Sequence, residues 1–236
     1  MIQMSNYIEV SNDRDVVIND TYKNVSLVKK IDAVDCERIY NPNGNRTTDV
    51  HYFEIPASIG DVVVFHANTM VAPYTPYSFT GGNGLFCNSK VNQWFYDNQS
   101  WIFSRGDAFF YIFRWQTTGK ENGLEIFNSN GEQIFNSNLK YLRIIDVIKE
   151  NVNSANWGTR SYPHKVGVVC CSMPVRYEDF GDRTGGIETL GVYFLNDNSF
   201  KIGTTFGYNA GICDSKPDGD WRGEIYILVV DLDGCD

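Results

Sequence analysis

The chain has 236 residues, a formal net charge of −9 at pH 7 and 42% hydrophobic residues, and aromatic residues make up 14% of it. A chain of this length and apolar content can bury a core, which excludes disorder, and an acidic chain without basic runs is a poor nucleic-acid binder. Alanine and leucine are scarce, whereas β-branched, aromatic and turn-forming residues are frequent. We therefore predict an all-β fold with little helix.

Segments in the first half of the chain have similar counterparts in the second half. The earliest pair consists of two strand–turn–strand patterns whose turns are rich in Asn, Asp or Gly. Three segments match in the same order, 8–20 with 124–136, 62–64 with 166–169, and 110–113 with 225–228. Chance similarity is the alternative to a tandem duplication. Duplication predicts two antiparallel β-sandwich domains, residues 1–118 and 119–236, joined by a polar linker around 116–123.

Short apolar segments between turn-rich stretches continue along both halves, as is typical of a sandwich or barrel. The continuous apolar runs 62–65 and 168–171 are predicted to be central strands covered on both faces. In residues 142–152, helical and strand periodicity fit the spacing of the isoleucines equally well.

The N-terminus has no basic region followed by an apolar stretch, and no apolar run approaches 18 residues. We expect neither a signal peptide nor a membrane span, and a chain that is made and kept in a cytoplasm. In that reducing compartment the six cysteines are expected to be free thiols. Cys170 and Cys171 are adjacent in a predicted strand, so their side chains should point to opposite faces. The six are Cys36, Cys87, Cys170, Cys171, Cys213 and Cys235.

Motifs for catalysis or metal binding are missing from the sequence. The three histidines have no nucleophile in a recognisable local context, and there is no P-loop, dinucleotide fingerprint or zinc-type spacing. The acidic segment 214–221 has the composition of a calcium loop, but Pro217 interrupts the ligand spacing. We predict no catalytic residues, no cofactor and no metal site; a hydrolase that uses a pair of carboxylates is an alternative.

Aromatic residues gather in one loop-rich region together with amide side chains. Such a platform stacks on sugar rings or anchors a protein interface, while packing in the core is the plainer explanation. The predicted recognition surface consists of Trp94, Phe95, Tyr96 and Trp101, with Trp157 and Trp221 as further members.

Residues 122–137, NGLEIFNSNGEQIFNS, followed by Lys140-Tyr141-Leu142-Arg143, resemble a hairpin pattern of small tail proteins of long-tailed bacteriophages. Asn136 stands where that family usually has Asp, and the pattern opens the second half of the chain instead of the first. A weaker copy lies at 16–27. The resemblance implies a non-enzymatic virion component at or near the tail tip, built from β-sandwich modules, and supplies no catalytic residues to transfer.

The leading hypothesis is a structural tail-tip or tail-fibre-associated protein. We expect it in the virion tail, in several symmetric copies that dock on other phage tail proteins and contribute to recognition of a glycan or protein on the host surface. The alternative is a carbohydrate-binding module that uses the Trp94 to Trp101 region to bind host surface polysaccharide.

Overall fold

The computed structural model describes residues 9–11, 16–19, 24–35, 37–39, 50–58, 60–68, 70–74, 93–97, 108–115, 123–128, 130–152, 158–172, 174–181, 184–211 and 224–236. This part of the chain consists mostly of antiparallel strands, with one 3-10 turn at Ala33–Asp35. The all-β prediction is therefore confirmed for the described residues. Residues 142–152 form strand, because β12 occupies Ile144–Asn151 and pairs with β18 along its length.

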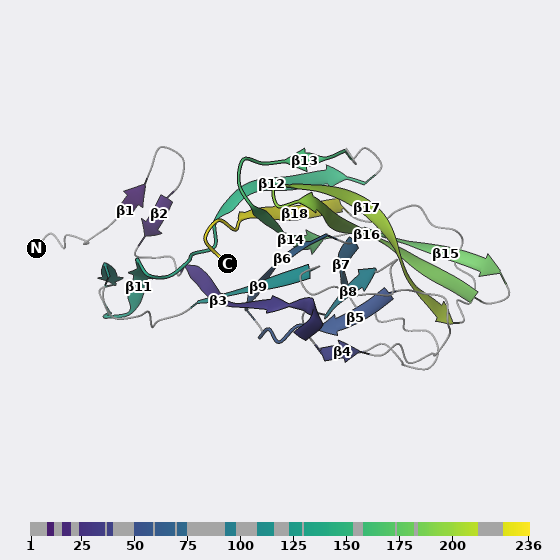
Figure 1. Ribbon diagram of the computed structural model, residues 1–236, viewed down its shortest axis with the longest axis horizontal. Coiled ribbons are helices and arrows are strands. Elements are labelled where there is room, and N and C mark those ends of the chain that lie inside the picture. The colour runs from purple at the N-terminus through teal and green to yellow at the C-terminus, as the bar shows by residue number, and fades with distance from the viewer. Residues whose placement is uncertain are drawn as a thin grey trace, which may run out of the picture.

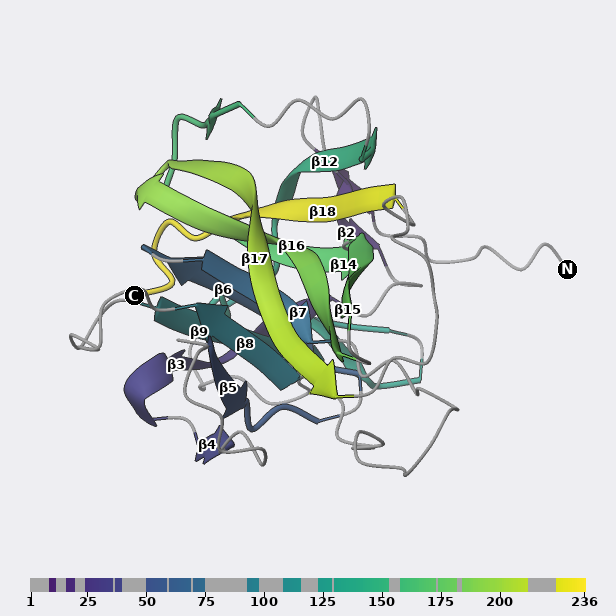
Figure 2. The same cartoon turned by 90° about the vertical axis from the view of Figure 1, so that its right-hand side faces the viewer.

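Six strands form the first sheet. Their order in space is β12 (Ile144–Asn151), β18 (Glu224–Asp231), β14 (Val166–Ser172), β6 (Val62–Ala67), β9 (Ala108–Trp115) and β3 (Val25–Asp32). The second sheet contains β13 (Arg160–Ser161), β17 (Ser199–Gly211), β16 (Thr184–Asn196), β7 (Met70–Tyr74), β8 (Gln93–Asp97), β5 (Val50–Glu54) and β4 (Glu37–Ile39), and β15 (Val175–Gly181) pairs with β16. Figure 2 shows the long strands β16 and β17 in front of the first sheet.

Both sheets contain strands from both predicted halves of the chain. In the first sheet the halves meet at β6 and β14, where Phe65 lies opposite Val168. In the second they meet at β7 and β16, where Val71 lies opposite Val192. Two separate sandwich domains are therefore not confirmed, and the predicted linker falls mostly outside the described residues. We call the β6–β14 and β7–β16 contacts the seam.

The main core lies between the two sheets. β6 has a continuous apolar sequence, and alternation along the strand sends Val63 and Phe65 into this core and Val64 to the other face. From the second sheet, Val192 and Phe194 of β16 pack into the same core. Because both faces of β6 are buried, the prediction that 62–65 is a central strand is confirmed.

A second, smaller core covers the opposite face of the six-stranded sheet. It contains Val64, Tyr111, Phe113 and Val230 from the strands, closed by Leu232 and Cys235 of the segment after β18. The segment before β12 pairs with β3, since Leu27 N donates to Lys140 O at 2.7 Å and Leu142 N donates to Val25 O at 2.9 Å. The two outermost strands of this sheet are thus linked at one end, and the sheet curls around the second core.

Two hairpins lie at one end of the molecule, to the left of the sheets in Figure 1. They are β1 (Glu9–Ser11) with β2 (Val16–Asn19), and β10 (Glu125–Phe127) with β11 (Gln133–Asn136). Both were predicted as strand–turn–strand segments, and both are confirmed. β2 contacts β11, so the two hairpins touch each other.

Candidate functional site

The predicted aromatic platform lies largely outside what the structure describes. Trp94, Phe95 and Tyr96 are consecutive residues of β8, between β5 and β7 in the second sheet, and Trp94 is in register with Phe53 and Pro73. Trp101, Trp157 and Trp221 fall outside the described residues, as does the acidic segment 214–221. The platform therefore stays a prediction.

In the described part of the chain, one group of three side chains brings potential metal-ligand atoms within 4.8 Å of one another: His164, Asp231 and Asp233. All four carboxylate oxygens already have protein partners. Asp231 accepts from Arg143 Nη1 at 3.0 Å and from the amide of Asp233 at 2.9 Å. Asp233 accepts from the amide of Lys165 at 3.1 Å and lies 3.0 Å from His164 Nδ1. These bonds hold the turn after β18 in place. That structural role is sufficient to explain why the three side chains lie together.

The segment after β18 is held a second time, through Asp236. Lys165 and Lys30 each place Nζ 2.7 Å from its carboxylate oxygens, and Tyr111 donates its hydroxyl to Oδ1 at 3.2 Å. The bonds from Lys165 and Lys30 lower the pKa of Asp236 well below its usual range. Burial, followed by the nearby Asp236 charge, raises the pKa of Tyr111, so its hydroxyl remains a donor. We call Asp236 with these three partners the Asp236 cluster; it ties β3, β9 and the start of β14 to one segment.

The turn of the β10–β11 hairpin is built from its own side chains. Asn128 Oδ1 accepts from the amides of Asn130 and Glu132, both at 2.9 Å, and its amide group donates to Glu132 Oε2 at 2.9 Å. Gly131 follows with a φ of +78°, a left-handed conformation that glycine adopts without strain. The predicted Asn- and Gly-rich turn chemistry is thus present, and it makes the hairpin locally rigid.

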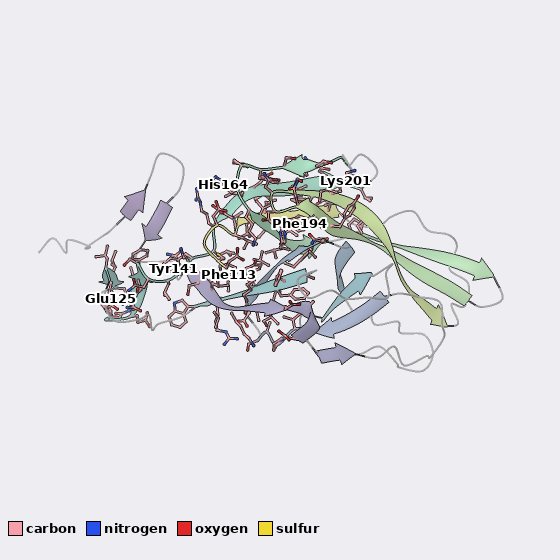
Figure 3. All side chains as sticks on the ribbon, viewed as in Figure 1. Phe113, Glu125, Tyr141, His164, Phe194 and Lys201 are labelled. Atoms are coloured by element: carbon pink, nitrogen blue, oxygen red, sulfur yellow. The ribbon has the colours of Figure 1, made fainter. Side chains whose placement is uncertain are left out.

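The base of the same hairpin is anchored to the sheets. Asn136 is fully buried; its amide donates to Tyr141 Oη at 2.6 Å and its side chain donates to Glu125 Oε1 at 3.1 Å. The Phe135 ring stacks on Tyr141 at 5.2 Å between centroids. Tyr141 in turn bridges to Ser26 of β3. These contacts brace the hairpin against the body; in Figure 3, Tyr141 lies between Glu125 on the hairpin and the sheets.

Large apolar side chains stand exposed on this fixed hairpin. Leu124 is 61% exposed and Phe127 is 51% exposed. The charged residues among 123–139 are Glu125 and Glu132, both acidic and both at the surface. We call Leu124, Glu125, Phe127 and Glu132 the hairpin surface. Exposed apolar residues on a braced hairpin that also carries carboxylates are suited to docking on a protein surface.

The thiols in the described part of the chain are free, as predicted. Cys170 packs against the main core, whereas Cys171, the next residue of β14, is exposed, which confirms their opposite orientation. Burial raises the pKa of both thiols and of Cys235. Lys140 and Lys165 lower the pKa of Cys235, but burial outweighs them. A raised pKa is the opposite of what activates a nucleophilic cysteine.

No family model, curated protein or solved structure matches this chain. Among the described residues there is no helix long and apolar enough to cross a membrane.

Proposed function

We propose that this protein is a non-enzymatic structural component of a bacteriophage tail, at the tail tip or associated with a fibre, and that the hairpin surface docks on other tail proteins. The observation that carries the proposal is the exposure of Leu124 and Phe127 on a hairpin that is rigid at both its turn and its base. The same residues belong to the segment that resembles the hairpin of phage tail proteins.

Rigidity of the hairpin favours docking on energetic grounds. Burial of an exposed leucine or phenylalanine side chain contributes about 1.5–3 kcal/mol. Because the backbone around them is already fixed, little conformational entropy is lost on binding. The carboxylates of Glu125 and Glu132 favour a partner whose apolar groove has basic residues at its rim.

Docking of this kind suits a subunit that is synthesised in the host cytoplasm and assembled into a virion. Several symmetric copies around the tail multiply each weak contact, and a glycan or protein of the host surface is a further partner. The fold supports a role of this type because two hairpins, β1–β2 and β10–β11, project from one end of the packed sheets (Figure 1).

The proposal includes an internal duplication of the chain. Strand order in the six-stranded sheet supports it, because β6 and β14 are neighbours at the centre, β9 and β18 lie next to them, and β3 and β12 are outermost. The segments that match in sequence thus occupy equivalent places on the two sides of the seam. The two hairpins also precede equivalent strands, β3 and β12.

The test is electron microscopy and adsorption of virions that carry a Phe127→Asp variant of this chain. We expect tail tips that lack density or adsorb poorly, because an aspartate cannot be buried in an apolar groove. Leu195→Asp is the matched control, since Leu195 is 48% exposed near the end of β16, away from the hairpin. Normal tips and adsorption for Phe127→Asp would contradict docking through the hairpin surface.

A further inference from the structure

A buried histidine occupies one end of the seam. His66, in β6, is 6% exposed, and its ring packs on Phe194 of β16 with 4.2 Å between centroids. Nδ1 lies 2.8 Å from the carbonyl oxygen of Val166, the first residue of β14. A carbonyl oxygen only accepts, so Nδ1 carries the proton in the neutral ring and donates it to Val166.

The other ring nitrogen, Nε2, is consequently the site where a further proton binds. It lies 3.5 Å from Oδ1 of Asp197, in the turn between β16 and β17. The same turn is fixed to β14, because Val166 N donates to Asp197 O at 2.9 Å. The imidazole belongs to β6 of the N-terminal half, and it contacts β14, β16 and the β16–β17 turn of the C-terminal half. Figure 3 shows Phe194, which packs on this ring, in the interior of the molecule.

We propose that His66 makes the seam acid-sensitive: a proton bound at Nε2 places a positive charge in the core and loosens the contact of β6 with β14 and the β16–β17 turn. This device is independent of the proposed tail function.

The charged groups around His66 determine the direction of the effect. Burial lowers its pKa and outweighs the Val166 carbonyl and the carboxylates of Asp197 and Asp236, which raise it; Lys165 lowers it further. A histidine whose pKa is lower in the folded than in the unfolded chain contributes full stability above about pH 6.5, the unfolded value. That contribution is lost as the pH falls below 6.5. Each pKa unit of difference corresponds to an approximately tenfold change in the folding equilibrium constant.

The experiment is urea denaturation of the full chain between pH 7.5 and pH 5. We expect the midpoint of the wild type to fall over this range and the midpoint of His66→Asn to stay nearly constant, because asparagine keeps a donor for Val166 O and binds no proton. His164→Asn is the control, since His164 is exposed and its ring contacts Asp233 rather than β6 or Phe194, and it should follow the wild type. Equal falls for the wild type and His66→Asn would overturn the proposal.

A second measurement tests the acid sensitivity of the seam even if the His66→Asn variant fails to fold. The imidazole resonances of His66 are followed by NMR in the wild-type chain as the pH is lowered. A titration midpoint below that of free histidine supports the proposal, and one at or above it overturns the proposal. At pH 5, amides of β6 and β14 should exchange faster than those of the β10–β11 hairpin, after correction for the intrinsic rate.

Discussion

Phe65 of β6 lies directly opposite Val168 of β14, and this pair joins the two halves of the chain within one sheet. Both side chains are fully buried in the core between the sheets, where the Phe65 ring meets Phe194 edge-on at 6.4 Å. The halves are therefore joined through the most buried part of the molecule. We expect them to unfold together, in one cooperative transition.

Replacing Phe65 with alanine should remove much of the packing that joins the two halves of the chain. A fully buried phenylalanine leaves a large cavity, so Phe65→Ala is expected to lower the free energy of unfolding by about 3–5 kcal/mol. Phe127→Ala is the matched control, because Phe127 is half exposed and its truncation should cost less than about 1 kcal/mol. Urea denaturation measures both. Similar losses for the two variants would contradict the assignment of the core.

The Asp236 cluster predicts a separate effect at lower pH. The folded-state pKa of Asp236 is lowered by Lys165 and Lys30, so its contribution to stability is present above the unfolded pKa of about 3.9 and is lost as the pH falls below it. The carboxylate is about half exposed, so Asp236→Asn should cost only about 1 kcal/mol at pH 7. The difference from the wild type should shrink as the pH falls below 3.9 toward the lowered folded-state pKa.

Glu224→Gln is the control for this experiment, because Glu224 and its partner Lys149 are both mostly exposed and 3.5 Å apart. It should leave the unfolding midpoint at pH 7 almost unchanged. The role of the cluster is refuted if Asp236→Asn is as stable as the wild type at pH 7, or if its deficit does not shrink as the pH falls from 4 to 2.

The hairpin turn should depend on Gly131 for conformational reasons alone. No atom lies within 4 Å of where a Cβ would be, yet the positive φ strains an L-residue, at a cost of about 1–2 kcal/mol. Gly131→Ala should therefore increase hydrogen exchange of the β11 amides, while Gly131→Asn, a residue that tolerates this conformation, should increase it less. Equal exchange rates in both variants would show that residue 131 does not have the left-handed conformation described here.

Cysteine labelling should separate Cys171 from Cys170 and Cys235. Cys171 is exposed, whereas Cys170 packs against the main core and Cys235 is buried in the second core. Alkylation of the native chain followed by peptide mass spectrometry should modify Cys171 before Cys170 and Cys235, slowly at neutral pH because partial burial of its sulfur raises the pKa. Prompt labelling of Cys235 would mean that the segment after β18 does not close the second core.

Local features were predictable from the sequence because local chemistry determines them. The β10–β11 turn follows from Asn128 and Gly131, and the central position of β6 follows from its unbroken apolar run. The segment 142–152 was ambiguous, since its isoleucines satisfy either period, and pairing with β18 decides for strand. Tertiary context here overrides local periodicity.

Long-range relationships could not be predicted in the same way. The joining of both halves in each sheet depends on which strand edges meet, and the duplicated pattern is equally compatible with two separate sandwiches. Lys30, Tyr111 and Asp236 are far apart in sequence, and no motif connects them. The contact of His66 with Val166 likewise spans 100 residues. Neither the Asp236 cluster nor the surroundings of His66 correspond to a local sequence pattern from which they could be predicted.

We propose that this chain is a component of a virion tail, and immunogold electron microscopy is the direct test of that proposal. Tailed phage particles are purified from lysates that contain the chain and are labelled with an antibody raised against the folded protein. We expect gold particles at the tail tip or fibre attachment site, in several copies per tail. Intact, infectious virions that carry no label and contain none of the chain by mass spectrometry would contradict it.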